Sequence, residues 1–155
     1  MNKIVEQIKN NSKYGSLAID NRKLMHSLGI DLENRRYIDL SNIPNEEISD
    51  LVMKSLMWME TINEVLASTK KSYMDQKLEV DNVFNKALKN LPQKTKVSEA
   101  KAEAKTNHEY LQAEKNSNML SSYVDYLNRL LDNLDKYHYV LKSRLDHAKN
   151  IERKY

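Results

Sequence analysis

Glycine and proline are scarce in this sequence of 155 residues, which contains two of each. Average usage of about 7% glycine would give roughly eleven. A β-sandwich or β-barrel needs a turn at about every 8–12 residues, usually built with glycine, asparagine or proline. Gly15 and Gly29 each stand alone, so a glycine-rich phosphate-binding loop is also excluded. The composition argues against all-β folds and favours helices.

Cysteine is absent, which excludes disulfides, zinc–thiolate sites and thiol nucleophiles and is typical of a reducing compartment. No apolar run reaches the roughly 20 residues that span a bilayer, and the first residues lack the apolar segment of a signal peptide. We therefore expect a soluble protein with no membrane partner. Its expected location is the cytoplasm, or the host cell cytoplasm if a phage encodes it.

Charge is abundant but nearly balanced, with a net charge of +3. The excess is C-terminal, because residues 94–155 carry twelve positive and nine negative side chains, whereas residues 1–47 carry seven of each. A mildly basic chain permits nucleic acid or another anionic partner without requiring one.

The first 45 residues predict short elements. We expect a helix over 3–10, extended chain over 16–20, and a helix over 21–28 with Gly29 as its C-cap. Two short apolar pieces within 30–45 predict a small hairpin or an irregular arm.

From residue 46 the pattern is strongly helical. Apolar or aromatic residues recur every seven positions, and this spacing predicts one helix over 46–90, started by Pro44 or Asn45. The row consists of Val52, Met59, Leu66, Tyr73, Val80 and Ala87.

A second helical run is predicted over 94–155, with Thr95 as a possible N-cap and a kink or stutter at 116–118. Its C-terminal part, about 118–155, alternates apolar spacings of four and three, which is typical of a helix that packs on other helices. The residues that we expect at an oligomer interface are Leu120, Val124, Leu127, Leu131, Leu134, His138, Leu141 and Leu145. His138 is the polar member that could specify register.

Together these runs predict an all-α protein. The expected architecture is a long helical hairpin of 46–90 and 94–155, with residues 1–45 as a small N-terminal helix and arm. Two helices of this length cannot bury both apolar stripes in a compact monomer, so we expect a coiled-coil, helical-bundle homo-oligomer.

Signals for catalysis are poor. His108 and Glu109 begin like a zinc-protease motif, but Gln112 stands where the second histidine is needed. Asp125, Asp132 and Asp135 share a helical flank, which a solvated surface explains. We expect no enzyme activity, no catalytic residue, no metal and no cofactor.

Two clusters of basic and aromatic residues are candidate nucleic-acid sites. Lys70, Lys71, Tyr73 and Lys77 lie at helical spacings, where lysines can contact phosphates and an aromatic ring can stack on a base. The second cluster, in which Lys142, Arg144 and Lys149 are the candidate contacts, consists of Tyr137, Tyr139, Lys142, Arg144, Lys149, Arg153, Lys154 and Tyr155. The alternative for both clusters is a solvated helix surface, and Tyr73 also fits the apolar row.

Met53, Met57 and Trp58 crowd a short stretch of the first long helix. Methionine adapts to irregular gaps, so these residues predict either core packing or a surface that docks a partner.

The layout resembles the UvsY-type recombination mediators of tailed phages. The residues that carry the resemblance are Ile19-Asp20-Asn21-Arg22-Lys23-Leu24, Trp58 in Lys54-Ser55-Leu56-Met57-Trp58, and Tyr126-Leu127-Asn128-Arg129-Leu130-Leu131-Asp132 running into Leu141-Lys142-Ser143-Arg144. In outline it covers most of the chain, and residues 29–47 look like an insertion relative to the family.

The resemblance implies a small, ATP-free, multimeric protein that binds single-stranded DNA. Such a protein would contact a RecA-like recombinase and a single-strand binding protein, and would help to load the former while displacing the latter. Lys70, Lys71 and Lys77 occupy the region of the family's basic, DNA-contacting stretch. The alternative is a coiled-coil adaptor or structural protein that binds a protein partner and no nucleic acid.

Overall fold

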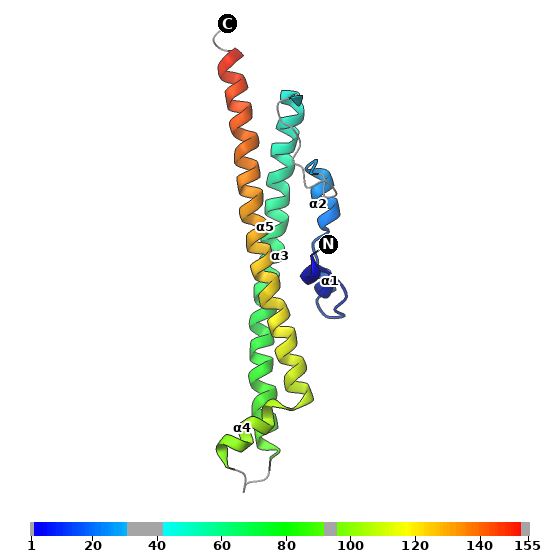
Figure 1. The fold of residues 1–155 in the computed structure, drawn as a ribbon, viewed down its shortest axis with the longest axis vertical. Coiled ribbons are helices and arrows are strands. Elements are labelled where there is room, and N and C mark those ends of the chain that lie inside the picture. Colours follow the sequence, from blue (N-terminus) through cyan, green and yellow to red (C-terminus); the bar gives the residue numbers. More distant parts are fainter. Residues whose placement is uncertain (1, 31–41, 92–95, 153–155) are drawn as a thin grey trace. The chain divides into compact units, whose positions relative to one another are not determined.

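The structure, a computed structural model, describes residues 2–30, 42–91 and 96–152. In chain order its elements are α1 (Lys3–Lys9), the 3-10 helix η1 (Gly15–Leu17), α2 (Asn21–Ser27), α3 (Asn45–Lys89), α4 (Val97–Lys105) and α5 (His108–Glu152). Every regular element in these residues is a helix, and α3 and α5 pack together (Figure 1). The predicted all-α helical hairpin is therefore confirmed. Over the described residues, no helix has both the length and the apolar character needed to cross a membrane.

The two short N-terminal helices begin and end where their capping residues lie. The Asn2 side chain accepts a hydrogen bond from the backbone N–H of Ile4 at the start of α1. The Asp20 carboxylate accepts bonds from Arg22 and Lys23 at the start of α2. Just beyond α2, Gly29 has a φ of 65°, a left-handed conformation that glycine adopts at low cost. The predicted helices and the Gly29 cap are confirmed.

The prediction of extended chain over 16–20 is wrong at the start of that range, because Gly15–Leu17 form the 3-10 helix η1. A Cβ atom on Gly15 would lie 2.9 Å from the carbonyl oxygen of Lys9, so only glycine fits this close approach. The predicted hairpin or arm of 30–45 falls mainly on residues 31–41, which lie outside the described residues.

The chain forms two compact units, each built from separate stretches of the sequence. Unit 1 combines residues 18–66 with 127–155, and unit 2 combines residues 2–17 with 67–126. Unit 1 therefore contains α2 with the first part of α3 and the second part of α5. Unit 2 contains α1, η1 and α4 with the remaining parts of α3 and α5. Each unit packs a short N-terminal segment on two long helices.

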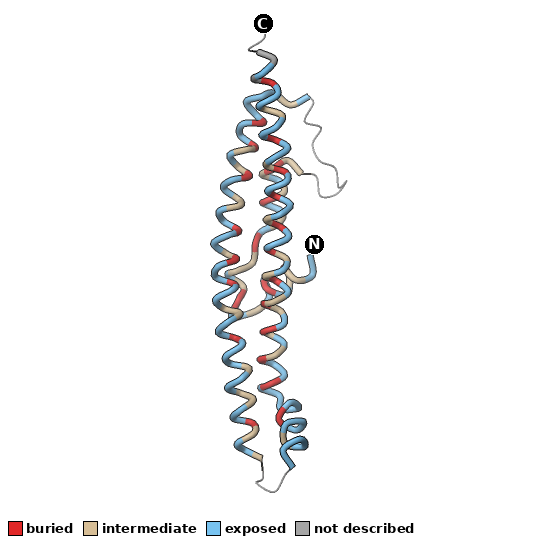
Figure 2. Tube along the Cα trace, turned by 90° about the vertical axis from the view of Figure 1, so that its left-hand side faces the viewer, coloured by how far each residue is buried: buried red, intermediate tan, exposed pale blue. Residues whose placement is uncertain are grey.

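The most deeply buried row of α3 is partly polar. Its members recur every seven residues, are at most 3% exposed, and are Ile48, Ser55, Ile62, Thr69 and Gln76. In the apolar row that the sequence pattern singled out, Leu66 and Ala87 are buried, and the other members are half-buried. That row flanks the centre of the packing surface. Figure 2 shows buried residues recurring along both long helices.

Half of the expected oligomer residues are buried by the chain itself. Leu120, Leu127 and Leu141 are fully buried and Leu134 is 3% exposed. The hairpin thus covers these four leucines without a second copy. The other four residues, Val124, Leu131, His138 and Leu145, are half-buried.

The second helical run is interrupted at a different place from the one predicted. Residues 116–118 lie within an unbroken α5, and the break falls at Thr106 and Asn107. The Asn107 Oδ1 atom accepts a hydrogen bond from the backbone N–H of Glu109 at 2.8 Å and so caps α5. Helix α4 starts at Val97 with Lys96 as its N-cap, and Thr95 lies outside the described residues.

Candidate nucleic-acid interface

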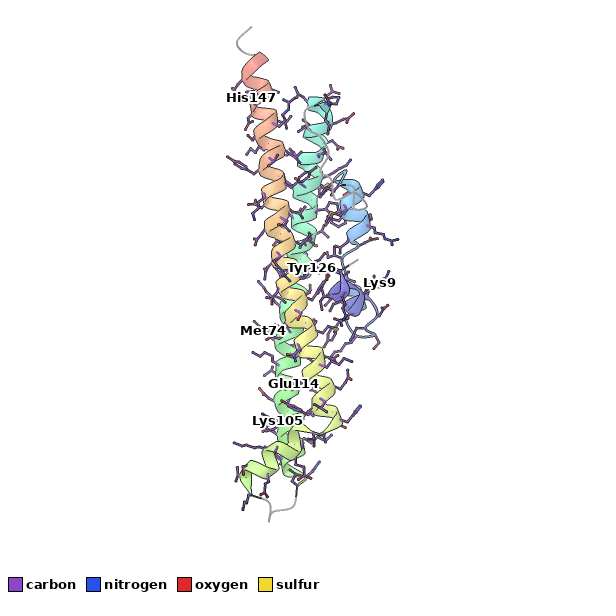
Figure 3. All side chains as sticks on the ribbon, viewed as in Figure 1. Lys9, Met74, Lys105, Glu114, Tyr126 and His147 are labelled. Carbon is purple, nitrogen blue, oxygen red and sulfur yellow. The ribbon has the colours of Figure 1, made fainter. Side chains whose placement is uncertain are left out.

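The lysine face of α3, which we define as Lys70, Lys71, Met74, Lys77 and Leu78, is exposed and belongs to unit 2. Spacings of three, four, seven and eight bring these side chains to one side of a helix. Met74 is 65% and Leu78 is 63% exposed, and Figure 3 shows the Met74 side chain on the outer surface of α3. The face therefore combines three cations with exposed apolar surface.

Asp75 and Asp81 follow Lys71 and Lys77 by four residues, the spacing at which helical ion pairs form. Within the described part of the chain, however, none of the three lysines forms an ion pair. The lysine ammonium groups thus remain available to an anionic partner, although the neighbouring carboxylates reduce the local positive potential.

Tyr73 is half-buried, and the Nζ atom of Lys77 lies 5.4 Å from the centre of its ring. This distance is typical of a cation–π contact. Lys77 therefore covers part of the ring, and less of the ring surface remains for stacking on a base than the sequence pattern suggested.

Lys142 and Arg144 of the C-terminal basic cluster do not share one surface. Lys142 is exposed and Arg144 is half-buried, and residues two positions apart on a helix point about 200° apart. The exposed Tyr139 shares the side of Lys142 with Asp135 and Asp146 at helical spacings. Lys149 lies in α5, but its side chain is outside the described part of the structure. The lysine face of α3 is the more coherent candidate.

The predicted docking residues separate into two kinds. Met53 and Met57 are 58% and 63% exposed, with Leu56 between them at 44%. Trp58 instead turns toward α2, where its Nε1–H donates to Ser27 Oγ at 2.5 Å. The exposed patch thus consists of Met53, Leu56 and Met57, and Trp58 has a structural role within unit 1.

His138, which we predicted at an oligomer interface, makes a polar contact within the chain. Its Nδ1 atom lies 2.8 Å from Ser55 Oγ, and the same oxygen lies 2.7 Å from the carbonyl oxygen of Val52. Because the hydroxyl has a single proton and the carbonyl can only accept, both bonds form when the Nδ1–H of His138 donates. The pair joins α3 to α5 inside unit 1 and fixes their register.

A polar groove of about 450 Å³ was not foreseen from the sequence. It lies in unit 2 between α1 with its following turn and the first part of α5. Its lining residues are Ile4, Gln7, Asn10, Asn11, Gln112, Lys115, Asn116, Asn118, Met119 and Ser122. Carboxamides have no helical repeat that a search for apolar periodicity would detect, and the two walls are about a hundred residues apart in sequence.

Among the described residues, no three histidine or carboxylate side chains gather as metal ligands. The tyrosines show the clearest electrostatic effects. Burial raises the pKa of Tyr137, and burial with the nearby Glu114 carboxylate raises the pKa of Tyr110.

No protein-family model matches the chain, and neither the curated proteins nor the solved structures give a significant match. The resemblance to UvsY-type mediators remains a prediction from the sequence.

Proposed function

We propose that this protein is a non-enzymatic mediator of DNA recombination that binds single-stranded DNA through the lysine face of α3. In this proposal it acts as a homo-oligomer and helps to load a RecA-like recombinase onto strands coated by single-strand binding protein. The sequence resemblance supplies the biological setting, and the lysine face supplies the contact with DNA.

The observation that carries the proposal is the exposure of Lys70, Lys71 and Lys77 beside Met74 and Leu78. Ammonium groups that contact phosphates release counterions, and this release drives the binding of single strands. Exposed apolar side chains next to these lysines offer contact to unstacked bases, which a duplex keeps covered.

The test is the affinity of the purified protein for a fluorescent single-stranded oligonucleotide at about 50 and about 300 mM salt. The triple variant Lys70→Ala, Lys71→Ala, Lys77→Ala should weaken binding by tenfold or more, as an order of magnitude, at the lower salt. For single strands the salt slope is roughly 0.7 per phosphate contact, so it should fall by about two.

A matched control is the triple variant Lys96→Ala, Lys101→Ala, Lys105→Ala, which removes the same charge from exposed positions in and beside α4. It should bind nearly as well as the wild type. Equal losses in both variants would mean that only net charge matters, and no binding by the wild type at low salt would refute the proposal.

The mediator step needs a separate measurement, because DNA binding alone does not load a recombinase. We expect the wild-type protein to speed recombinase assembly on DNA coated by single-strand binding protein, and the lysine-face variant to lose this effect. Oligomerisation would use the half-buried Leu131, His138 and Leu145. Leu131→Asp should then lower the mass in solution while leaving the helices intact.

A second candidate function is favoured by the exposed patch of Met53, Leu56 and Met57. Neighbouring large apolar side chains at a surface can mark a site of protein interaction. A coiled-coil adaptor would bind a protein through this patch and would not bind DNA at any salt concentration. Met57→Glu should then abolish partner binding, whereas the lysine-face variant should have no effect.

A further inference from the structure

The polar groove of unit 2 has an unusual set of lining groups. Six of its ten residues carry carboxamides, one carries an ammonium group, and none carries a carboxylate. A volume of about 450 Å³ lies within the usual range for small-molecule pockets. Such a lining is suited to a polar ligand that offers both donors and acceptors.

Several of these polar groups are not used by the fold. Asn11 Oδ1 accepts from the backbone N–H groups of Lys13 and Tyr14, so that atom stabilises the turn. Gln112 donates to Asn116 over 3.4 Å at an exposed position, which is a weak bond. Gln7, Asn118 and Lys115 form no hydrogen bond or ion pair within the described residues.

The two walls place these groups on opposite sides. Gln7 projects from α1, whereas Gln112 and Lys115 project from α5, all three at exposed positions. Ile4 and Met119 add one apolar side chain from each wall.

We propose that this groove binds one nucleotide of a single-stranded nucleic acid, with the base edge held by carboxamides and a phosphate held by Lys115. Carboxamides pair with base edges because they offer a donor and an acceptor side by side. The base must be unpaired, since a duplex covers its Watson–Crick edge. The inference extends the proposed function to a second contact, and it rests on that function only for the class of ligand.

A peptide is the less suitable occupant. Carboxamides would also bond a peptide backbone, but peptide grooves need apolar pockets for alternate side chains. Ile4 and Met119 are the only clearly apolar residues of the lining. The lining contains no carboxylate that would repel the negative charge of a phosphodiester chain. A neutral peptide would gain nothing from this absence.

The experiment compares two oligonucleotides of about 12 residues, one with bases and one with abasic sugars throughout. The double variant Gln7→Ala, Gln112→Ala removes one carboxamide from each wall at exposed positions. It should bind the base-containing strand about tenfold more weakly than the wild type, the effect of losing two hydrogen bonds. On the abasic strand the variant and the wild type should differ by less than about twofold.

The matched control is the double variant Asn63→Ala, Asn133→Ala, which removes two exposed carboxamides from α3 and α5 within unit 1. It should bind both strands as the wild type does. Equal weakening of the groove variant on both strands, or no weakening on either, would overturn the assignment of base recognition.

Failure of the groove and failure of the proposed function can be told apart with adenosine monophosphate as a second probe. At millimolar concentration it should shift the side-chain amide signals of Gln112 and Asn116 in a nitrogen–proton spectrum. A shift in the wild type, together with a lysine-face variant that binds the oligonucleotide as tightly as the wild type, would refute the lysine-face proposal and keep the groove. Unchanged signals, or displacement of the nucleotide by a short neutral peptide, would overturn the inference itself.

Discussion

Units 1 and 2 hold their N-terminal segments by similar means but leave different surfaces exposed. In unit 1, Trp58 and Tyr137 of the long helices donate hydrogen bonds to Ser27 Oγ and to the carbonyl oxygen of Leu28, at the end of α2. Ser27 Oγ in turn donates to the carbonyl oxygen of Leu24. These bonds satisfy groups that a helix C-terminus leaves unpaired.

In unit 2 the corresponding contacts fix a loop. Tyr123 donates to the carbonyl oxygen of Leu17, and Tyr14 donates to Gln76 Oε1 at 2.6 Å. The Nε2–H of Gln76 donates to the carbonyl oxygen of Ala113, so one buried amide joins the N-terminal segment to α5. In both units, tyrosine hydroxyls or the tryptophan N–H thus hold the N-terminal segment in place. The units differ in their surfaces, since the lysine face and the polar groove both belong to unit 2.

The largest expected effect is loss of packing in unit 1. Leu141→Ala removes a fully buried side chain and should lower the free energy of unfolding by about 2–5 kcal/mol. Denaturant unfolding followed by the fluorescence of Trp58, the single tryptophan of the chain, measures this loss. Hydrogen exchange should show unit 1 opening before residues 67–126 of unit 2.

The half-buried Leu131 provides the control for this prediction, because it lies on the same helix and loses the same atoms on replacement by alanine. Leu131→Ala should cost clearly less than Leu141→Ala. Equal costs, together with a lower mass in solution, would mean that contacts between copies contribute as much as the hairpin does.

The next effect concerns unit 2. Gln76→Leu leaves the buried Tyr14 hydroxyl without its acceptor and removes the side-chain bond to the Ala113 carbonyl, which still accepts its helical bond within α5. This change should cost about 1–3 kcal/mol, since a buried hydroxyl then lacks a partner. Hydrogen exchange should show reduced protection of the segment around Tyr14 and none at α2. Equal loss of protection at α2 would contradict the separation into two units.

Gln76 also shows how far the sequence could predict this fold. The helical runs, a helix start at Pro44 or Asn45, and the Gly29 cap followed from propensity and capping, which are local properties. The central row of α3 did not, because Ser55, Thr69 and Gln76 are polar and a search for apolar spacing places them on the surface. Their partners, including His138 for Ser55, are distant in sequence and become apparent only in the folded hairpin.

Of the two candidate sites, the lysine face could be predicted from the sequence, whereas the polar groove could not. The exposure of Lys70, Lys71 and Lys77 could be predicted because long charged side chains rarely lie in a core. Their helical spacing predicted that they lie near one face of α3. The groove was missed because its two walls meet only after folding. The break at Asn107 could have been found, since asparagine is a preferred N-cap and a helix-forming run follows it.

A smaller effect tests the docking of α2 in unit 1. Ser27→Ala removes the oxygen that accepts the Trp58 Nε1–H and should cost about 1 kcal/mol. The fluorescence maximum of Trp58 should shift to longer wavelength, because an indole without its partner is exposed to water. Ser12→Ala, at an exposed position in unit 2, should leave the emission of Trp58 unchanged. A shift of equal size there would show that Trp58 does not report on α2 alone.

The smallest effect at neutral pH comes from Tyr137→Phe, which removes the hydroxyl that donates to Leu28 and should cost about 1 kcal/mol. Burial raises the pKa of Tyr137 above its ordinary value of 10.0. The protonated hydroxyl is therefore favoured in the folded state, and this stabilisation is fully present below pH 10 and is lost as the pH rises through the folded-state pKa. The phenylalanine variant has no such group, so its deficit relative to the wild type should shrink as the pH rises above 10. Denaturation of both proteins at neutral and alkaline pH measures the difference in their free energies of unfolding. If this difference stayed constant with pH, Tyr137 would ionise equally in the folded and unfolded chains.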